Sequence, residues 1–227
     1  MAGDAIEAEI RAVDAHLAER YGSKAPKKRP DPLSGLIRTI LSQSSTSANT
    51  SRAFESLRER FESWDELADA SDAEIADAIH SGGLANQKAP RIRAVVKELI
   101  EERGEASLEW IDDLPTAEAL EYLTHFKGVG PKTAACVLLF SLGRPVFPVD
   151  THVHRVAIRL GWIPPDTDAA SAHDLLGEMI PENRAYQIHL NIVQHGRETC
   201  RSQNPACAKC VLLDLCDHGQ DQMQDNQ

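Results

Sequence analysis

The sequence is poor in aromatic residues and contains no long hydrophobic run. Only 5% of its 227 residues are Phe, Trp or Tyr. Nothing approaches the roughly 18 consecutive apolar residues that a membrane-spanning helix needs. The first ten residues, MAGDAIEAEI, lack the basic stretch and apolar run of a secretory signal peptide. We therefore expect no membrane association, and secreted and fibrous classes are excluded.

The sequence also lacks the alternation of apolar and polar residues, with a period of two, that a half-buried β-strand requires. Apolar residues recur instead every three or four positions, and 42% of the chain is hydrophobic. The sequence predicts an all-α protein. Ser71, Thr116 and Asp150 are the predicted N-caps, and the polar tail from Gln220 is expected to be frayed. Helices are predicted over 34–60, 72–80, from Pro90 to 100, and over 116–125, 131–142, 151–160, 169–180 and 185–197.

Acidic side chains outnumber basic ones, 35 to 24, which gives a net charge of −11. The excess is concentrated in residues 55–125, which carry 18 acidic and 7 basic groups. Between residues 126 and 160, by contrast, five basic side chains face a single acid, Asp150. Because phosphate binding depends on the local surface and not on overall charge, an anionic polymer is not excluded as a partner.

Four of the five cysteines form the pattern C-x6-C-x2-C-x5-C at Cys200, Cys207, Cys210 and Cys216. Four thiolates in so short a segment can enclose one metal centre, either zinc or an iron–sulfur cluster. The spacing favours a four-iron cube, since structural zinc sites usually pair two short knuckles. Two disulfides are the alternative, which a reducing compartment disfavours. The fifth, Cys136, lies in an apolar helical run and is expected in the core.

A glycine-containing turn separates two predicted helices in the segment F-K-G-V-G-P-K-T, residues 126–133. Gly128 and Gly130 permit a tight turn and leave no side chain to keep a ligand away. Pro131 suits the first position of the following helix, whose N-terminus attracts anions such as phosphate. A plain helix–helix connection is the alternative interpretation of this pattern.

Lys132 is predicted in the first turn of that helix, where the helix dipole disfavours a cation. A lysine amine that loses its proton is a nucleophile that forms Schiff bases. Eighteen residues later, the segment V-D-T-H contains Asp150, which can cap its helix and also take a proton or stabilise a cationic sugar. A solvated surface lysine and a purely structural cap are the alternatives.

Taken in order, G-V-G-P-K-T-A, V-D-T-H and the cysteine pattern resemble endonuclease III, of the helix–hairpin–helix DNA glycosylase superfamily. The resemblance runs from about Leu36 to Cys216. It implies two all-α domains that flank a DNA cleft. Residues 33–145 would form a six-helix barrel with the helix–hairpin–helix, and residues 1–32 with 146–227 a discontinuous iron–sulfur cluster domain.

This resemblance implies a base-excision-repair enzyme that extrudes a damaged, oxidised pyrimidine from the duplex, removes it and cleaves 3′ of the abasic site by β-elimination. Lys132 would attack the sugar C1′, and Asp150 would assist. The cysteines of the C-x6-C-x2-C-x5-C pattern would hold a [4Fe–4S] cluster with a structural role. The expected partner is double-stranded DNA with damaged bases or abasic sites, bound by a monomer in the cytoplasm, at the nucleoid.

The resemblance also identifies candidate DNA-binding residues. The hairpin would hold the phosphate backbone, and side chains inserted into the base stack would come from two further segments, L41-S42-Q43 and G83-L84-A85-N86-Q87-K88-A89. The candidates are Lys127, Gly128, Val129, Gly130, Thr133, Gln43, Ser44, Leu84 and His152.

The chain departs from the family pattern in several places. The first segment has Ser47 where the family has an acid, and its glutamine stands one place early. The motifs F-P-V-D and R-L-G-W, which begin at Phe147 and Arg159, are similar to those of plant glycosylases that excise 5-methylcytosine. Two alternatives therefore accompany the glycosylase–lyase hypothesis: a DNA-binding module with lost or shifted base recognition, which binds or cleaves only abasic sites, and a cluster-based redox protein.

Overall fold

The computed structural model describes residues 2–25 and 29–224. Within them the chain is helical and contains no strand, which confirms the all-α expectation. Clustering of the contacts divides it into two units, Met1–Lys28 with Pro145–Gln227 (unit 1) and Arg29–Arg144 (unit 2); the sequence placed these boundaries at 32/33 and 145/146. Among the described residues, no helix is long and apolar enough to cross a membrane.

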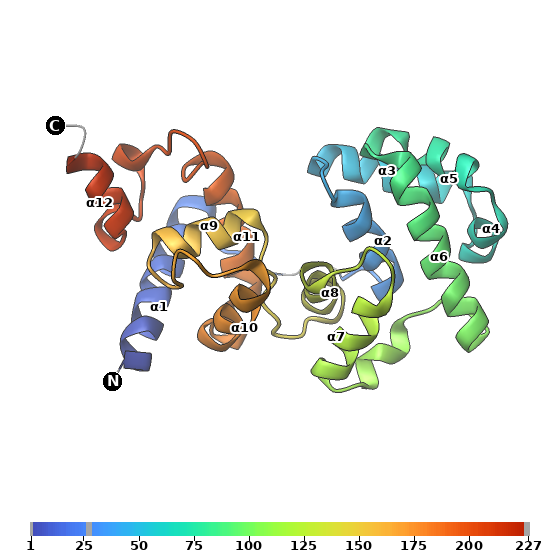
Figure 1. The fold of residues 1–227 in the computed structure, drawn as a ribbon, viewed down its shortest axis with the longest axis horizontal. Helices are drawn as coiled ribbons and strands as arrows, with labels where there is room; N and C mark the ends of the chain where they lie inside the picture. The colour runs from blue at the N-terminus through green and yellow to red at the C-terminus, as the bar shows by residue number, and fades with distance from the viewer. Residues whose placement is uncertain (1, 26–28, 225–227) are drawn as a thin grey trace. The chain divides into compact units, whose positions relative to one another are not determined.

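Unit 2 consists of short helices around one long helix, α6 (Figure 1). Helices α2, α4 and α5 all pack against α6, and α2 also packs against α3 and α8. The elements are α2 (Pro32–Ser42), α3 (Ser47–Arg60), α4 (Trp64–Asp69), α5 (Asp72–Ala78), the 3-10 turn η1 (His80–Gly82), α6 (Ala85–Arg103), η2 (Glu109–Asp113), α7 (Thr116–His125), α8 (Pro131–Val137) and the π-helical turn η3 (Leu138–Leu142).

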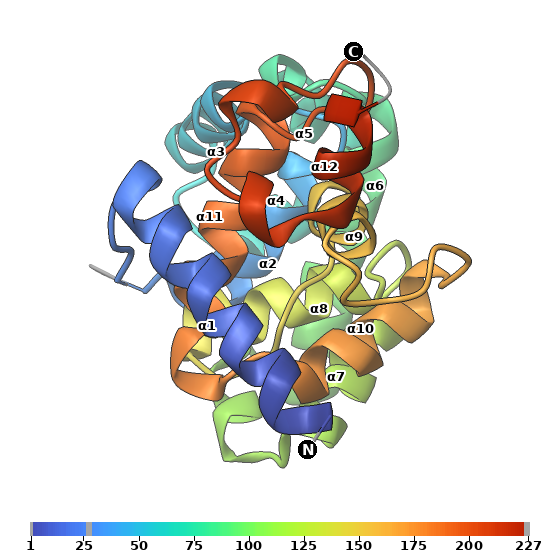
Figure 2. The ribbon, with the colours of Figure 1, turned by 90° about the vertical axis from the view of Figure 1, so that its left-hand side faces the viewer.

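Unit 1 joins the N-terminal helix to the last third of the chain. Helix α1 runs beside α11, and α9 packs on α11 as well (Figure 2). The elements are α1 (Ala2–Tyr21), α9 (Thr151–Arg159), α10 (Ala169–Met179), η4 (Glu182–Arg184), α11 (Ala185–Glu198), η5 (Cys207–Lys209), η6 (Leu213–Leu215) and α12 (Asp217–Gln224).

Each unit has its own apolar core, built from residues at helical spacing. In α1, Ile10, Val13 and Leu17 are fully buried, and in α2 the adjacent Leu36 and Ile37 are too. Burying one such side chain contributes about 1.5–3 kcal/mol. The two cores therefore hold together segments that are distant in sequence.

Two predicted helix boundaries are wrong. The helix expected over 34–60 is two helices, because Thr46 acts as an N-cap and its hydroxyl accepts a hydrogen bond from Asn49 N at 3.2 Å. The helix expected from Pro90 begins at Ala85, so Pro90 lies inside α6. A proline in a helix interior removes one backbone hydrogen bond, and here the packing of α6 against α4 and α5 tolerates this loss.

Three smaller expectations are also corrected. Pro115, not Thr116, precedes the first residue of α7, and no side chain caps that helix. The helix that starts at Pro131 changes to a π-helical turn from Leu138. The polar tail expected to be frayed is helical up to Gln224, and residues 225–227 lie outside the described residues.

Candidate nucleic-acid interface and metal centre

The turn between α7 and α8 presents backbone to solvent. Gly128 adopts φ +87, and Gly130 has an extended backbone that leads directly into α8. Both glycines and Lys127 are exposed, whereas Val129 is only 4% exposed and anchors the turn in the core. Thr133 is buried as well. Of the predicted contacts in this turn, Val129 and Thr133 can therefore offer a ligand their backbone and not their side chains.

Arg91, on α6, lies against this turn and was missed by the sequence analysis. A Cβ atom on Gly128 would come within 2.8 Å of Arg91 Cδ. Gln43 joins the same cluster: its Nε2 donates to Gly128 O at 3.2 Å, and its Oε1 accepts from Arg91 Nη1 at 3.5 Å. The structure thus brings the predicted filler Gln43 against the hairpin. No sequence signal distinguishes Arg91 from the other basic residues of α6.

Ser44 and Leu84 share a conformation that non-glycine residues rarely adopt. Their φ angles are 51 and 52, in the left-handed region, and a bulky residue such as leucine is strained there. Both side chains point to solvent, and Leu84 is 49% exposed. The two loops are neighbours, because a Cβ atom on Gly83 would lie 4.0 Å from Ser44 O. An exposed leucine on a strained loop fits a side chain that inserts into a base stack.

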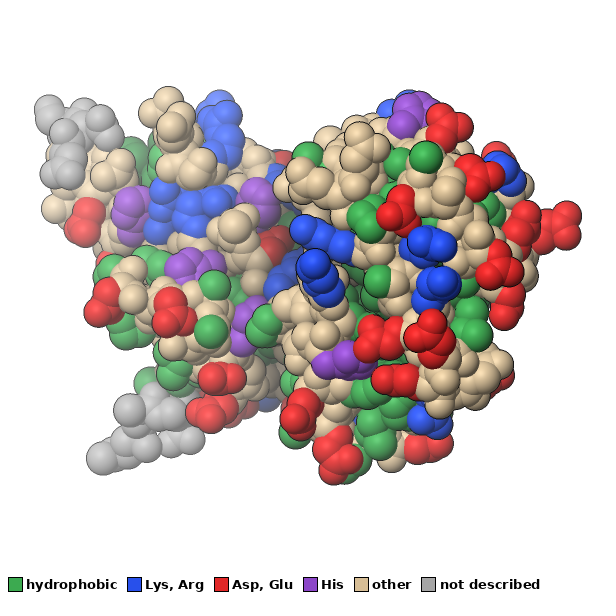
Figure 3. Space-filling model, turned by 45° about the vertical axis from the view of Figure 1, so that its right-hand side comes forward, with side chains coloured by type: hydrophobic (Ala, Val, Ile, Leu, Met, Phe, Trp, Pro, Cys, Tyr) green, Lys and Arg blue, Asp and Glu red, His purple; other side chains and the backbone are tan. Residues whose placement is uncertain are grey.

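Lys132 lies in unit 2, in the first turn of α8, and its side chain is half-buried. Unit 2 is acidic overall, but Figure 3 shows lysine and arginine side chains close together on one of its faces, bordered by acidic ones. A local basic area of this kind can bind phosphate although the chain has a net negative charge.

Asp150 lies in unit 1 and caps α9, as the sequence predicts. Its Oδ1 accepts hydrogen bonds from His152 N and Val153 N, both at 2.8 Å. Within the described part of the chain, its Oδ2 accepts no hydrogen bond. One oxygen therefore fixes the side chain and the other is available for a proton or a cation.

His152 follows this cap and is half-buried between α9 and α11. Arg155 Nη2 donates to its Nδ1 at 3.1 Å, and a Cβ atom on Gly196 would come within 2.8 Å of His152 Cβ. Burial, followed by the charges of Arg155 and Arg197, lowers the pKa of His152, while Asp150 opposes the shift. The imidazole of His152 therefore favours its neutral form and offers hydrogen-bonding atoms in place of a positive charge.

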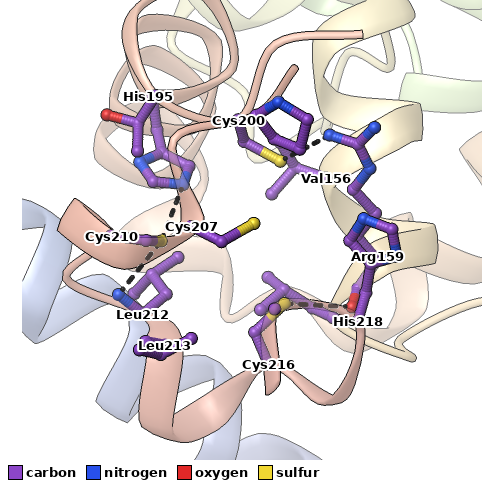
Figure 4. A pocket seen from close by; sticks show the side chains of 14 residues that line it. Val156, Arg159, His195, Cys200, Cys207, Cys210, Leu212, Leu213, Cys216 and His218 are labelled. Atoms are coloured by element: carbon purple, nitrogen blue, oxygen red, sulfur yellow. Dashed lines mark hydrogen bonds between the residues drawn. The ribbon is translucent and has the colours of Figure 1, made fainter. Parts of the chain in front are cut away.

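The four clustered cysteines line one pocket in unit 1, between α9, α11 and the loop that follows α11 (Figure 4). All four are free thiols, so the two-disulfide alternative is not what the fold adopts. Apolar side chains close the pocket, among them Val156, Leu212 and Leu213. Cys136, in contrast, is 4% exposed and belongs to the core of unit 2, as predicted.

The donors of this pocket fit a metal centre. Burial, followed by the neighbouring cysteines, raises the pKa of Cys210 to about 11, and burial also raises that of Cys216. Four thiolates would therefore repel one another in this pocket unless a positively charged centre compensated them. Thiolate sulfur is the donor that iron–sulfur clusters and zinc prefer.

Hydrogen-bond donors surround the sulfurs. Arg159 Nη1 donates to Cys200 Sγ at 3.2 Å, and Leu212 N donates to Cys210 Sγ at 3.4 Å. His195 Nε2 lies 3.7 Å from Cys210 Sγ. Such contacts stabilise metal-bound thiolates, which carry negative charge. Arg159 also donates to Arg201 O at 2.8 Å, so it holds the cysteine loop to α9.

Comparison with known proteins agrees with this arrangement. Residues 37–182 match the HhH-GPD superfamily of base excision DNA repair proteins. The chain is 36% identical over 203 residues to endonuclease III of Thermotoga maritima and covers 91% of that protein. It is 33% identical over 172 residues to the DNA glycosylase/AP lyase ROS1 of Arabidopsis thaliana, of which it covers 12%. It covers 56% of another Arabidopsis relative, to which it is 41% identical.

Among solved structures, the fold is similar to that of endonuclease III in a non-covalent complex with DNA. The TM-score is 0.80 at 27% identity, over 96% of this chain and 98% of that one. A thermostable thymine-DNA glycosylase, 19% identical, shares the fold with a TM-score of 0.77.

The helical fold, the glycine hairpin before Lys132 and the family match over residues 37–182 define a base excision DNA repair protein of the HhH-GPD superfamily. Within that superfamily, the chain belongs to the endonuclease III family.

Proposed function

We propose that this protein is a bifunctional DNA glycosylase and AP lyase that removes damaged pyrimidines from double-stranded DNA. The observation that carries the proposal is the half-buried Lys132, which begins α8 directly after the exposed glycines of the hairpin. Asp150 supports it, because the cap of α9 holds its carboxylate and leaves Oδ2 available.

In this mechanism the Lys132 amine attacks C1′ of an extruded nucleotide. The Nζ–C1′ bond forms while the glycosidic bond breaks, and the base leaves with the electron pair and takes up a proton. Asp150 accepts the proton that the amine loses. Asp150 then passes this proton to O4′ as the C1′–O4′ bond breaks, and the sugar ring opens to a protonated Schiff base.

The Schiff base makes the C2′ proton acidic. Loss of that proton and departure of the 3′ phosphate constitute the β-elimination, and water then hydrolyses the imine and restores the amine. The chain supplies the nucleophile and one carboxylate for these steps. The carboxylate also stabilises the cationic character that develops on the sugar.

DNA recognition is assigned to unit 2 and to the start of α9. Lys127 and the backbone of Gly128–Gly130, with buried Val129 and Thr133 as anchors, would contact phosphates. Leu84, Ser44 and Gln43 would occupy the space that the extruded base leaves. His152 would add a neutral hydrogen-bonding contact.

We propose a [4Fe–4S] cluster for the four-cysteine pocket. Cys200, Cys207, Cys210 and Cys216 would hold it, and it would supply the positive charge that the four thiolates require. Its role is structural, because it joins the loop after α11 to α9 and α12.

One experiment decides between a lyase and a binding module. Abasic duplex DNA is incubated with the protein and borohydride, which reduces a Schiff base to a stable amine. A covalent adduct is expected with wild-type protein and with Lys97→Ala, a lysine of α6 outside the assigned DNA contacts, and none with Lys132→Ala. An adduct that persists in Lys132→Ala would overturn the assigned nucleophile.

The damaged base is identified with a panel of duplexes. The set contains thymine glycol, dihydrouracil, uracil, 5-methylcytosine and an abasic site. Release of the first two bases supports the proposal. Cleavage of the abasic duplex alone would favour the second candidate, an abasic-site lyase, which is motivated by the exposed Ser47 at the start of α3.

A further inference from the structure

Lys88 is a buried lysine that the proposed mechanism does not use. Its side chain is 1% exposed although it carries an ammonium group. Its Nζ donates to Leu41 O at 2.7 Å and to Gly82 O at 2.9 Å. Burying a charged group is costly, so a fully buried lysine on an otherwise half-exposed helix needs a reason in the surrounding structure.

The two acceptors are carbonyl groups at the ends of helical segments. Leu41 O lies in the last turn of α2, and Gly82 is the last residue of η1. Carbonyl groups at helix ends lack partners within the helix and carry partial negative charge. One ammonium group therefore caps two helical ends at once.

The residues that follow these two ends are the strained ones. Ser44 comes three residues after Leu41, and Leu84 two residues after Gly82. In the described part of the chain only one other non-glycine residue, Asn204, has a positive φ. Strained conformations persist only when the surrounding structure fixes them. Lys88 joins the two helical ends that lead into these strained residues.

We propose that Lys88 is a positioning residue that holds Leu84 and Ser44 ready for insertion into the DNA base stack. Lys88 has no role in the chemistry at the sugar. It acts by fixing the loops 43–46 and 81–84 before DNA arrives, so that ordering them costs no binding energy. This inference rests on the proposed function.

The first test is a double-mutant cycle on excision of a damaged base under single-turnover conditions. The variants are Lys88→Met, Leu84→Ala and the double mutant. Lys88→Met is expected to slow excision about tenfold, equivalent to about 1.4 kcal/mol. Adding it to Leu84→Ala should cost little more, because the side chain that Lys88 positions is then already absent. Additive losses would mean that Lys88 does not act through Leu84 and would overturn the proposal.

The matched control is Lys97→Met, on the same helix. Within the described part of the chain, Lys97 makes no hydrogen bond or ion pair, and its replacement should leave excision unchanged. Trapping on abasic DNA is measured in parallel. Because an abasic site has no base to extrude, Lys88→Met should keep most of its adduct formation.

Adduct formation and base excision together distinguish a failure of the proposed function from a failure of the proposed role of Lys88. If wild-type protein forms no adduct and releases no base, the proposed function fails. If wild-type protein is active and Lys88→Met excises at the same rate, the role of Lys88 fails while the function stands.

A second measurement needs no variant and so covers the case in which Lys88→Met does not fold. Amide hydrogen exchange is followed in the free wild-type protein at loops 43–46 and 81–84. Preformed loops should be protected, at Ser45 and Gly83 above all, whose amides donate to Ser42 O and His80 O. Exchange as fast as in an unstructured peptide, slowed only when DNA binds, would overturn the inference.

Discussion

The side chain of Arg91 lies where a side chain at position 128 would stand. A Cβ atom on Gly128 would be 2.8 Å from Arg91 Cδ and 3.1 Å from its Nε, and the residue has φ +87. Gly128 therefore serves two purposes: it permits the turn, and it lets α6 approach the hairpin. Gly130 differs, because its φ is −99 and a Cβ atom there would meet no atom within 4 Å.

This contrast predicts different effects of two matched substitutions. Gly128→Ala should displace Arg91 and strain the turn, at a cost of about 1 kcal/mol or more in unfolding free energy, and weaken DNA binding. Gly130→Ala should leave the unfolding free energy within about 0.5 kcal/mol of wild type. Urea unfolding and titration of a labelled abasic duplex measure both effects. Equal losses of unfolding free energy in Gly128→Ala and Gly130→Ala would contradict the role of Arg91.

The two roles of Asp150 are separable by substitution. Asparagine is as good an N-cap as aspartate, so Asp150→Asn should keep the stability of α9 and lose only the carboxylate. Asp150→Ala should lose both, with a cost of about 1 kcal/mol in unfolding free energy. We expect excision to slow in both variants, measured under single-turnover conditions. Full activity of Asp150→Asn would show that Asp150 is a cap and nothing more.

Replacing any one cysteine of the pocket should release the proposed cluster. Cys207→Ser is expected to lose bound iron and sulfide and to destabilise unit 1, since the loop after α11 would no longer be fixed. Cys136→Ala is the matched control and should retain the metal. Chemical analysis of iron, sulfide and zinc in purified protein checks this. Stoichiometric zinc without sulfide would replace the proposed cluster with a zinc site.

The lowered pKa of His152 predicts a pH dependence of stability. The unfolded chain takes up a proton at His152 near pH 6.5, whereas the folded protein does so only at lower pH. The contribution of His152 is therefore complete above pH 6.5 and is lost as the pH falls below it. Protonation also breaks the hydrogen bond from Arg155 to Nδ1.

The measurement compares urea unfolding at pH 7.5 and pH 5.5. His152→Gln should lose less stability between the two values than wild type, because glutamine has no proton to gain. His16→Gln is the control: that side chain is exposed and should leave the wild-type difference unchanged. An identical loss in His152→Gln and wild type would contradict the assignment.

The local geometry of the candidate site could be predicted because it depends on nearby residues. Asp150 caps α9 and Ser71 caps α5, where Glu74 completes a capping box, since these interactions join residues only two or three positions apart. The cysteine pattern and the glycine hairpin are equally local. Helical periodicity gave the all-α class, because a single helix already shows its apolar face.

The positions of Lys88 and Arg91 could not be predicted, because they depend on contacts between segments that are distant in sequence. Lys88 joins the end of α2 to the turn before α6, because its ammonium group donates to carbonyls 47 and 6 residues away in sequence. Arg91 lies against the hairpin only because α6 packs beside it.

The sequence by itself determined the class of fold and the N-cap at Asp150, and it singled out the candidate metal donors and the candidate nucleophile, because spacing and capping are properties of short segments. Tertiary structure alone decided which lysine is buried, which arginine supports the hairpin and which loops carry strain. These features arise when distant carbonyls and side chains share one desolvated space, where every polar group needs a partner.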